Sequence, residues 1–115
     1  MARRDRDYSV PIEDMIAAIA GVRLAAGGDT AEVLAMDWVR SRAIERGFEV
    51  ISEASRRLPD SLKAGEPGIP WGKIAGIGNV LRHDYEGIEP SMLLTAIVED
   101  LPELEAALRR MLAQL

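Results

Sequence analysis

Apolar residues recur at every third or fourth position along most of this 115-residue chain, which is the spacing of an amphipathic helix. The first such stretch covers about residues 11–25, and its apolar face is formed by Ile12, Met15, Ile16, Ile19 and Val22. Ser9 and Pro11 favour a helix start before it, and the pair Gly27-Gly28 favours a helix end after it. This periodicity constrains the chain most strongly, and it predicts an all-α protein.

The second periodic stretch begins at about Asp29 or Thr30, either of which can cap a helix, and ends near Pro59. We expect a break near Asp37. The predicted apolar face comprises Val39, Ala43, Phe48 (or Gly47), Val50, Ile51 and Ala54. The arginines of this stretch lie off that face, and we expect most of them to pair with acidic neighbours on a solvated surface.

The remainder of the chain divides at its prolines and glycines. A short turn is expected at residues 61–64, followed by the loop GEPGIPWG at 65–72, from which Trp71 should anchor the chain onto the core. A helix is predicted from Lys73 to about Tyr85, with Gly87 as its terminator. The last helix should begin near Glu89-Pro90 and bend or break at Pro102.

The length and composition fit one compact domain over residues 1–115. Aromatic residues make up only 4 % of the chain, so aliphatic side chains must fill the core, as they do where helices pack together. Four or five helices with short connections predict an up-and-down bundle, and so small a core favours dimerisation. Without cysteines or a membrane-spanning stretch, a cytoplasmic protein is expected. A net charge of −5 argues against a broad non-specific nucleic-acid surface.

The segment GNVLRHDYEG, residues 78–87, contains the only histidine of the chain. On a helix, Asn79 and His83 share one face, while Gly78 and Arg82 share the neighbouring one. An imidazole with a pKa of about 6.5 can both donate and accept a proton, and a guanidinium can bind phosphate. The segment therefore suits phosphoryl transfer. The alternative is a histidine that only stabilises a helix end through the helix dipole. A lone histidine predicts no metal site, and no motif for a cofactor is present.

The stretches FEVISEASRRLPDSL and IPWGKIAGIGNVLRHDYEGIEPSMLLTAIVEDLPEL resemble the HepT-like family of the HEPN superfamily, small all-α toxins of prokaryotic toxin–antitoxin pairs. The resemblance implies a HEPN-like fold and a metal-independent ribonuclease that acts as a homodimer, with tRNA among its candidate substrates. It also implies a type VII-like partner, a minimal nucleotidyltransferase antitoxin that adds AMP to a motif tyrosine. By motif match, His83 is the catalytic histidine, Tyr85 is the AMP acceptor, and Asn79 is the polar residue of the motif.

The chain departs from the family motif R-x-x-x-x-H-x-Y at Gly78, where the motif has arginine. Glycine inside a helix costs about 1 kcal/mol relative to alanine, so we expect this residue to be unfavourable for the fold. The missing guanidinium has three explanations: natural loss of activity, selection against a harmful active toxin in an expression host, or replacement by Arg82. The alternative function is a catalytically inactive helical module that docks a nucleotidyltransferase. Arg46 and Glu53 either line the same cleft or form an ion pair or a dimer contact.

Overall fold

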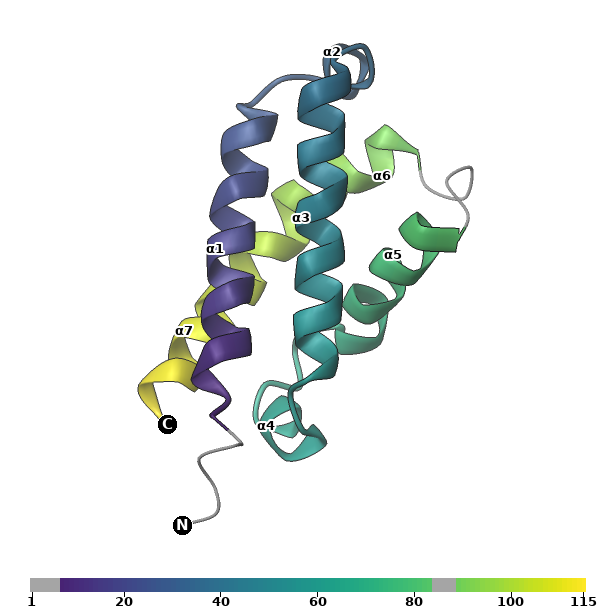
Figure 1. Cartoon of the computed structure of the whole chain (residues 1–115). Helices are drawn as coiled ribbons and strands as arrows, with labels where there is room; N and C mark the ends of the chain where they lie inside the picture. The colour runs from purple at the N-terminus through teal and green to yellow at the C-terminus, as the bar shows by residue number, and fades with distance from the viewer. Residues whose placement is uncertain (1–6, 84–88) are drawn as a thin grey trace.

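A computed structural model describes residues 7–83 and 89–115, except for the side chains of Arg82 and His83. All regular secondary structure in these ranges is helical, which confirms the predicted all-α class (Figure 1). In chain order the elements are α1 (Ser9–Ala26), α2 (Ala31–Ala35), α3 (Trp38–Arg56), α4 (Asp60–Ala64), α5 (Trp71–His83), α6 (Pro90–Thr95), the π-helical turn η3 (Ala96–Asp100) and α7 (Leu101–Ala113).

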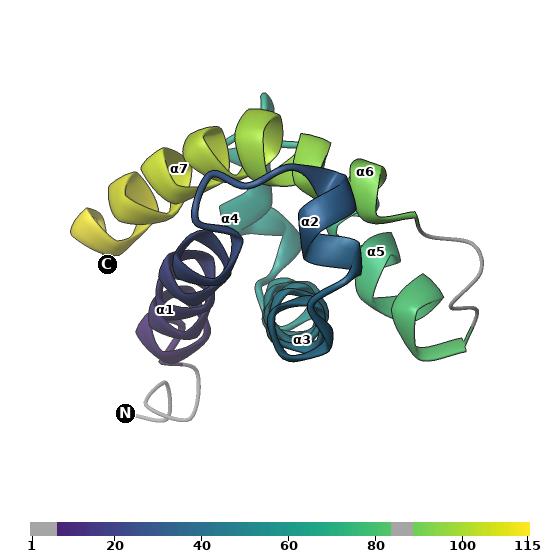
Figure 2. The same cartoon turned by 90° about the horizontal axis from the view of Figure 1, so that it is seen from above.

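The helices α1, α3 and α5 lie side by side in one layer and alternate in direction (Figure 1). The continuous segment α6–η3–α7 runs across them and covers one face of that layer (Figure 2). The core lies between the two layers and is filled by aliphatic side chains such as Ile12, Met15, Leu104 and Leu108. The three alternating helices follow the predicted up-and-down order, and the C-terminal segment closes the bundle from the side.

The break predicted near Asp37 is confirmed, because the carboxylate of Asp37 accepts a hydrogen bond from the backbone N–H of Arg40 and caps α3. Thr30, rather than Asp29, caps the short helix α2 through the N–H of Val33. Asp29 instead accepts a 2.7 Å hydrogen bond from Arg40. The guanidinium of Arg40 also donates to the last carbonyls of α1, so this side chain joins the end of α1 to the start of α3.

The predicted apolar face of α3 was partly wrong. Val39 is 70 % exposed and Ala43 is exposed, whereas Ile44, which the prediction left out, is buried. The buried residues of α3 are Ile44, Phe48, Ile51, Ser52, Ala54 and Ser55. The buried stripe is thus rotated around the helix relative to the prediction, because two small serines belong to it and hydropathy alone does not count them as core.

Several boundaries also differ from the sequence prediction. Residues 60–64 form the short helix α4 rather than a turn, and α5 begins at Trp71 rather than at Lys73. Trp71 packs against the core as expected, and its indole N–H donates to the carbonyl of Glu66. The bend or break expected at Pro102 is present as the π-helical turn Ala96–Asp100, which ends two residues before the proline, consistent with a proline ring that lacks an N–H and crowds the preceding turn.

Candidate functional site

The candidate site residues of the motif lie at the C-terminal end of α5. Asn79 is exposed, and Arg82 and His83 are the last two residues of the helix. One helical turn separates Asn79 from His83, so the two positions fall on one face of α5, as the spacing predicted. The prediction for Tyr85 lies outside the described residues.

Gly78 is buried at the contact between α5 and α3, and it faces Ser52. A β-carbon on Gly78 would lie 2.5 Å from both Cβ and Oγ of Ser52 and 3.5 Å from Cα of Glu49. Distances of 2.5 Å are well below van der Waals contact, so a larger residue needs the two helices to separate. The sequence expectation that Gly78 is unfavourable for the fold was therefore wrong: the missing side chain lets α5 approach α3 closely.

The same contact is fixed by two hydrogen bonds to the carbonyl oxygen of Ala75, one turn before Gly78. The fully buried hydroxyl of Ser52 donates to this oxygen at 2.6 Å, and Nη2 of Arg56 donates to it at 2.7 Å. Sequence reasoning missed both residues. The sequence feature that could have identified Ser52 is its position between Phe48, Ile51 and Ser55, which together form the inner face of α3.

The two carboxylates that precede Ser52 along α3, Glu45 and Glu49, are paired with arginines. Arg46 donates to Glu49 at 3.3 Å, and Arg42 donates to Glu45 at 2.8 Å. This agrees with the solvated pairing predicted for most arginines of the helix. Arg46 forms its ion pair with Glu49 within α3, which supports the ion-pair interpretation among the three left open for Arg46 and Glu53. Glu45 precedes Ser52 by seven residues, about two turns of α3. Because α5 runs antiparallel to α3, its C-terminal end points toward the beginning of α3 (Figure 1).

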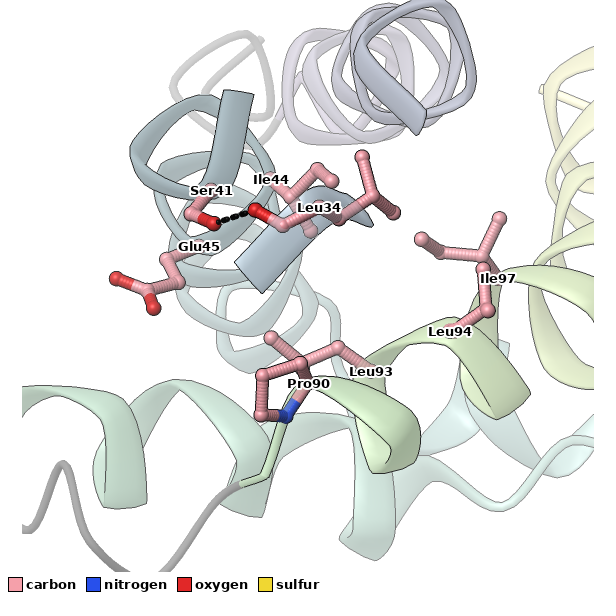
Figure 3. A pocket seen from close by; sticks show the side chains of 8 residues that line it. All are labelled: Leu34, Ser41, Ile44, Glu45, Pro90, Leu93, Leu94 and Ile97. Atoms are coloured by element: carbon pink, nitrogen blue, oxygen red, sulfur yellow. Dashed lines mark hydrogen bonds between the residues drawn. The ribbon is translucent and has the colours of Figure 1, made fainter. Parts of the chain in front are cut away.

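A small cavity of about 40 Å³ lies between α2, α3 and the α6–η3 segment. Figure 3 shows its lining, in which Leu93, Leu94 and Ile97 face Leu34 and Ile44, while the carboxylate of Glu45 points away from them. The hydroxyl of Ser41 donates to the carbonyl of Leu34 at 2.5 Å. A cavity this small and mostly apolar has room for a water molecule or two and not for a nucleotide.

Two ion pairs hold the beginning of α5 against the C-terminal segment. Lys73 donates to Asp100 at 2.8 Å, and this hydrogen bond raises the pKa of Lys73. Both carboxylate oxygens of Glu66, in the loop before α5, accept from Arg110 of α7 at 2.7 and 3.1 Å. That bidentate hydrogen bond lowers the pKa of Glu66 below its ordinary value of 4.5. The start of α5 is thus anchored on one side by η3 and α7, and its middle by α3.

Among the side chains that the structure describes, no three His, Cys, Asp or Glu residues gather closely enough to hold a metal ion, and the side chain of His83 is outside that set. None of the helices within residues 7–83 and 89–115 combines the length and the hydropathy that a membrane span requires.

Comparison with known proteins identifies relatives that cover most of the chain. A "Probable ribonuclease HepT" of Thermococcus cleftensis is 30 % identical over 111 residues, which cover 96 % of this chain and 98 % of the relative. A "Putative RNase" of Caldanaerobacter subterraneus is 33 % identical over 85 residues, 74 % of this chain and 76 % of the relative. No solved structure matches. The family model described as Ribonuclease HepT-like matches residues 12–111, so the chain belongs to the HepT-like ribonuclease family.

Proposed function

We propose that this chain is the ribonuclease toxin of a type VII-like toxin–antitoxin pair and acts on RNA, tRNA included, in the cytoplasm. The observation that carries the proposal is the family match over residues 12–111, which includes the sequence His83-Asp84-Tyr85 that begins at the last residue of α5. Relatives over most of the chain are named as ribonucleases, which supports the same class of reaction.

The proposed reaction is attack by a 2′-hydroxyl of RNA on the adjacent phosphorus, with departure of the 5′-oxygen of the next nucleotide. His83 accepts the proton of the attacking hydroxyl or protonates the leaving oxygen, since an imidazole can do either near neutral pH. A guanidinium stabilises the negative charge that builds on the phosphate, and Asn79 adds a neutral hydrogen-bond donor. These groups supply the chemistry that a metal ion would otherwise provide.

Arg82 is the proposed source of that guanidinium. The motif position, Gly78, is filled by close helix packing against Ser52 and has no room for an arginine side chain. Arg82 follows Gly78 by one helical turn, about 6 Å along α5, and is adjacent to His83. Packing of α5 against α3 thus gives a physical reason for Gly78 that does not require the loss of ribonuclease activity.

The proposed partners are a second copy of the chain and a minimal nucleotidyltransferase antitoxin. In this proposal the phenolic oxygen of Tyr85 attacks the α-phosphorus of ATP bound by the antitoxin, which forms a tyrosyl-AMP ester and releases pyrophosphate. The added phosphate places bulk and negative charge two residues from His83, where an RNA phosphate must bind. Modification of Tyr85 therefore blocks cleavage.

Cleavage of labelled RNA, tRNA included, in the presence of a metal chelator tests this function. We expect His83→Ala to lower the rate by about 10²-fold to 10⁴-fold and Arg82→Ala by about 10²-fold to 10³-fold. Arg109→Ala, which removes an exposed arginine paired with Glu105 on α7, should leave the rate unchanged. Wild-type protein that cleaves no RNA, or His83→Ala with full activity, contradicts the proposal. For Tyr85, mass spectrometry after incubation with the antitoxin and ATP should find one added AMP, which Tyr85→Phe abolishes.

The second candidate function is a catalytically inactive helical module that docks the nucleotidyltransferase. The absence of arginine at position 78 favours it. It predicts that the nucleotidyltransferase binds and modifies the chain. It also predicts that RNA cleavage by the wild-type protein stays at background, so that Arg82→Ala and His83→Ala do not lower it.

A further inference from the structure

Trp38 is an exposed aromatic side chain in a protein that has few aromatic residues. It is 71 % exposed at the first position of α3, whereas Trp71, the other tryptophan, packs against the core. The guanidinium carbon of Arg42, one turn further along α3, lies 5.8 Å from the centroid of the Trp38 ring, within the range of a cation–π contact. Trp38 thus presents an aromatic surface to solvent, and the partly exposed guanidinium of Arg42, which is also paired with Glu45, lies beside it.

The position of this pair on α3 relates it to the candidate site. Trp38, Arg42, Glu45, Glu49, Ser52 and Arg56 are spaced by three or four residues and therefore follow one face of the helix. The second half of this face contacts α5 through Ser52 and Arg56. The first half continues beyond the end of α5, as Figure 1 shows, because α3 extends further than α5 in that direction. The exposed pair thus lies on the α5 side of α3, beyond the turn that carries Arg82 and His83.

An aromatic ring next to a guanidinium suits a single-stranded nucleic acid. An unpaired base can stack on an indole whatever its sequence, and a guanidinium can bind the neighbouring phosphate. In duplex RNA the bases are stacked on each other and are not available to the ring. Since the chain has a net charge of −5, local stacking must contribute more to RNA affinity than long-range attraction of phosphates.

We propose that Trp38 and Arg42 form a binding surface for single-stranded RNA that leads to the end of α5. In this arrangement a base stacks on Trp38, and Arg42 exchanges its 2.8 Å ion pair with Glu45 for a phosphate of the same strand. The proposal rests on the proposed ribonuclease function and adds the substrate class, an unpaired strand, and two residues that recognise it. The exposed Met36 and Val39 beside Trp38 would also suit a protein contact, so the test must separate the two uses.

Binding is measured with the His83→Ala protein, so that RNA remains intact, by the fluorescence anisotropy of a labelled ten-nucleotide single strand and of the same strand in a duplex. We expect the single strand to bind more tightly than the duplex. Trp38→Ala should weaken this binding about tenfold, and Trp38→Phe should restore most of it because a phenyl ring also stacks. Arg42→Ala should weaken binding and make its salt dependence shallower, whereas Arg109→Ala, the matched arginine control, should do neither.

Equal affinity of Trp38→Ala and its parent for the single strand overturns the proposal, and so does preference for the duplex. If Trp38→Ala alters only self-association in sedimentation, the surface is a protein contact and the proposal is wrong. Circular dichroism verifies that each variant is folded, which is expected because Trp38 is exposed. The ribonuclease function can fail on its own. If RNA binds through Trp38 but the wild-type protein does not cleave it, the ribonuclease function is contradicted and the binding surface is not.

Discussion

Ser52 on α3 and Gly78 on α5 share a space that holds only one side chain, because a β-carbon on Gly78 would lie 2.5 Å from Cβ of Ser52. Gly78→Ala should therefore lower the free energy of unfolding by up to about 2 kcal/mol. Overpacking costs about 1–3 kcal/mol, from which the roughly 1 kcal/mol that alanine gains over glycine in a helix is subtracted. Urea unfolding measures the change.

Gly76 provides the control for this substitution within the same helix. No heavy atom outside the neighbouring backbone lies within 4 Å of a β-carbon at Gly76. Gly76→Ala should therefore raise the free energy of unfolding by about 0.5–1 kcal/mol. If Gly78→Ala stabilises the protein as Gly76→Ala does, the close contact with Ser52 is not present in solution. Gly78→Arg should destabilise the protein further and should not increase RNA cleavage.

The hydrogen bonds to the carbonyl of Ala75 can be tested through their shared acceptor. Ser52→Ala should cost about 1 kcal/mol, since it removes one buried hydrogen bond while Arg56 still donates to the same oxygen. Arg56→Ala should cost less, because the side chain is exposed. The double variant should lose more free energy of unfolding than the sum of the two single losses, because the carbonyl of Ala75 then has neither side-chain donor. Strict additivity in a double-mutant cycle would contradict a shared acceptor.

The contact between α1 and α3 depends on a second glycine, Gly47. A β-carbon there would overlap Cγ2 of Val22, which is itself buried. We expect Gly47→Ala to lower the midpoint of thermal unfolding, and Gly47→Ala/Val22→Ala to recover part of the loss because the second change removes the overlapping methyl group. Gly21→Ala on α1, where a β-carbon meets nothing within 4 Å, should not lower it. An unchanged midpoint for Gly47→Ala contradicts this packing.

The ion pair between Glu66 and Arg110 should make stability depend on pH in the acid range. Because Arg110 lowers the pKa of Glu66 in the folded protein, the stabilisation is complete above the ordinary value of 4.5 and is lost as the pH falls through the lowered pKa. Arg110→Gln should therefore lower the unfolding midpoint near neutral pH, with a difference from wild type that shrinks as the pH falls below the ordinary pKa of Glu66. Glu66→Gln/Arg110→Gln should resemble Arg110→Gln. A difference that is constant with pH would exclude this pair as its source.

The sequence by itself determined the long helices, the break near Asp37, the anchoring role of Trp71 and the place of Asn79, Arg82 and His83 at the end of one helix. These features are local, since helical periodicity and capping involve residues within one or two turns. Only the tertiary structure decided which face of α3 is buried and why position 78 is glycine. Ser52 and Ala75 are 23 residues apart in sequence, and their hydrogen bond exists only where α3 and α5 pack. Within α5 alone Gly78 is unfavourable, but it is favourable where α5 packs on α3, because the side chain of Ser52 fills the space that the glycine leaves.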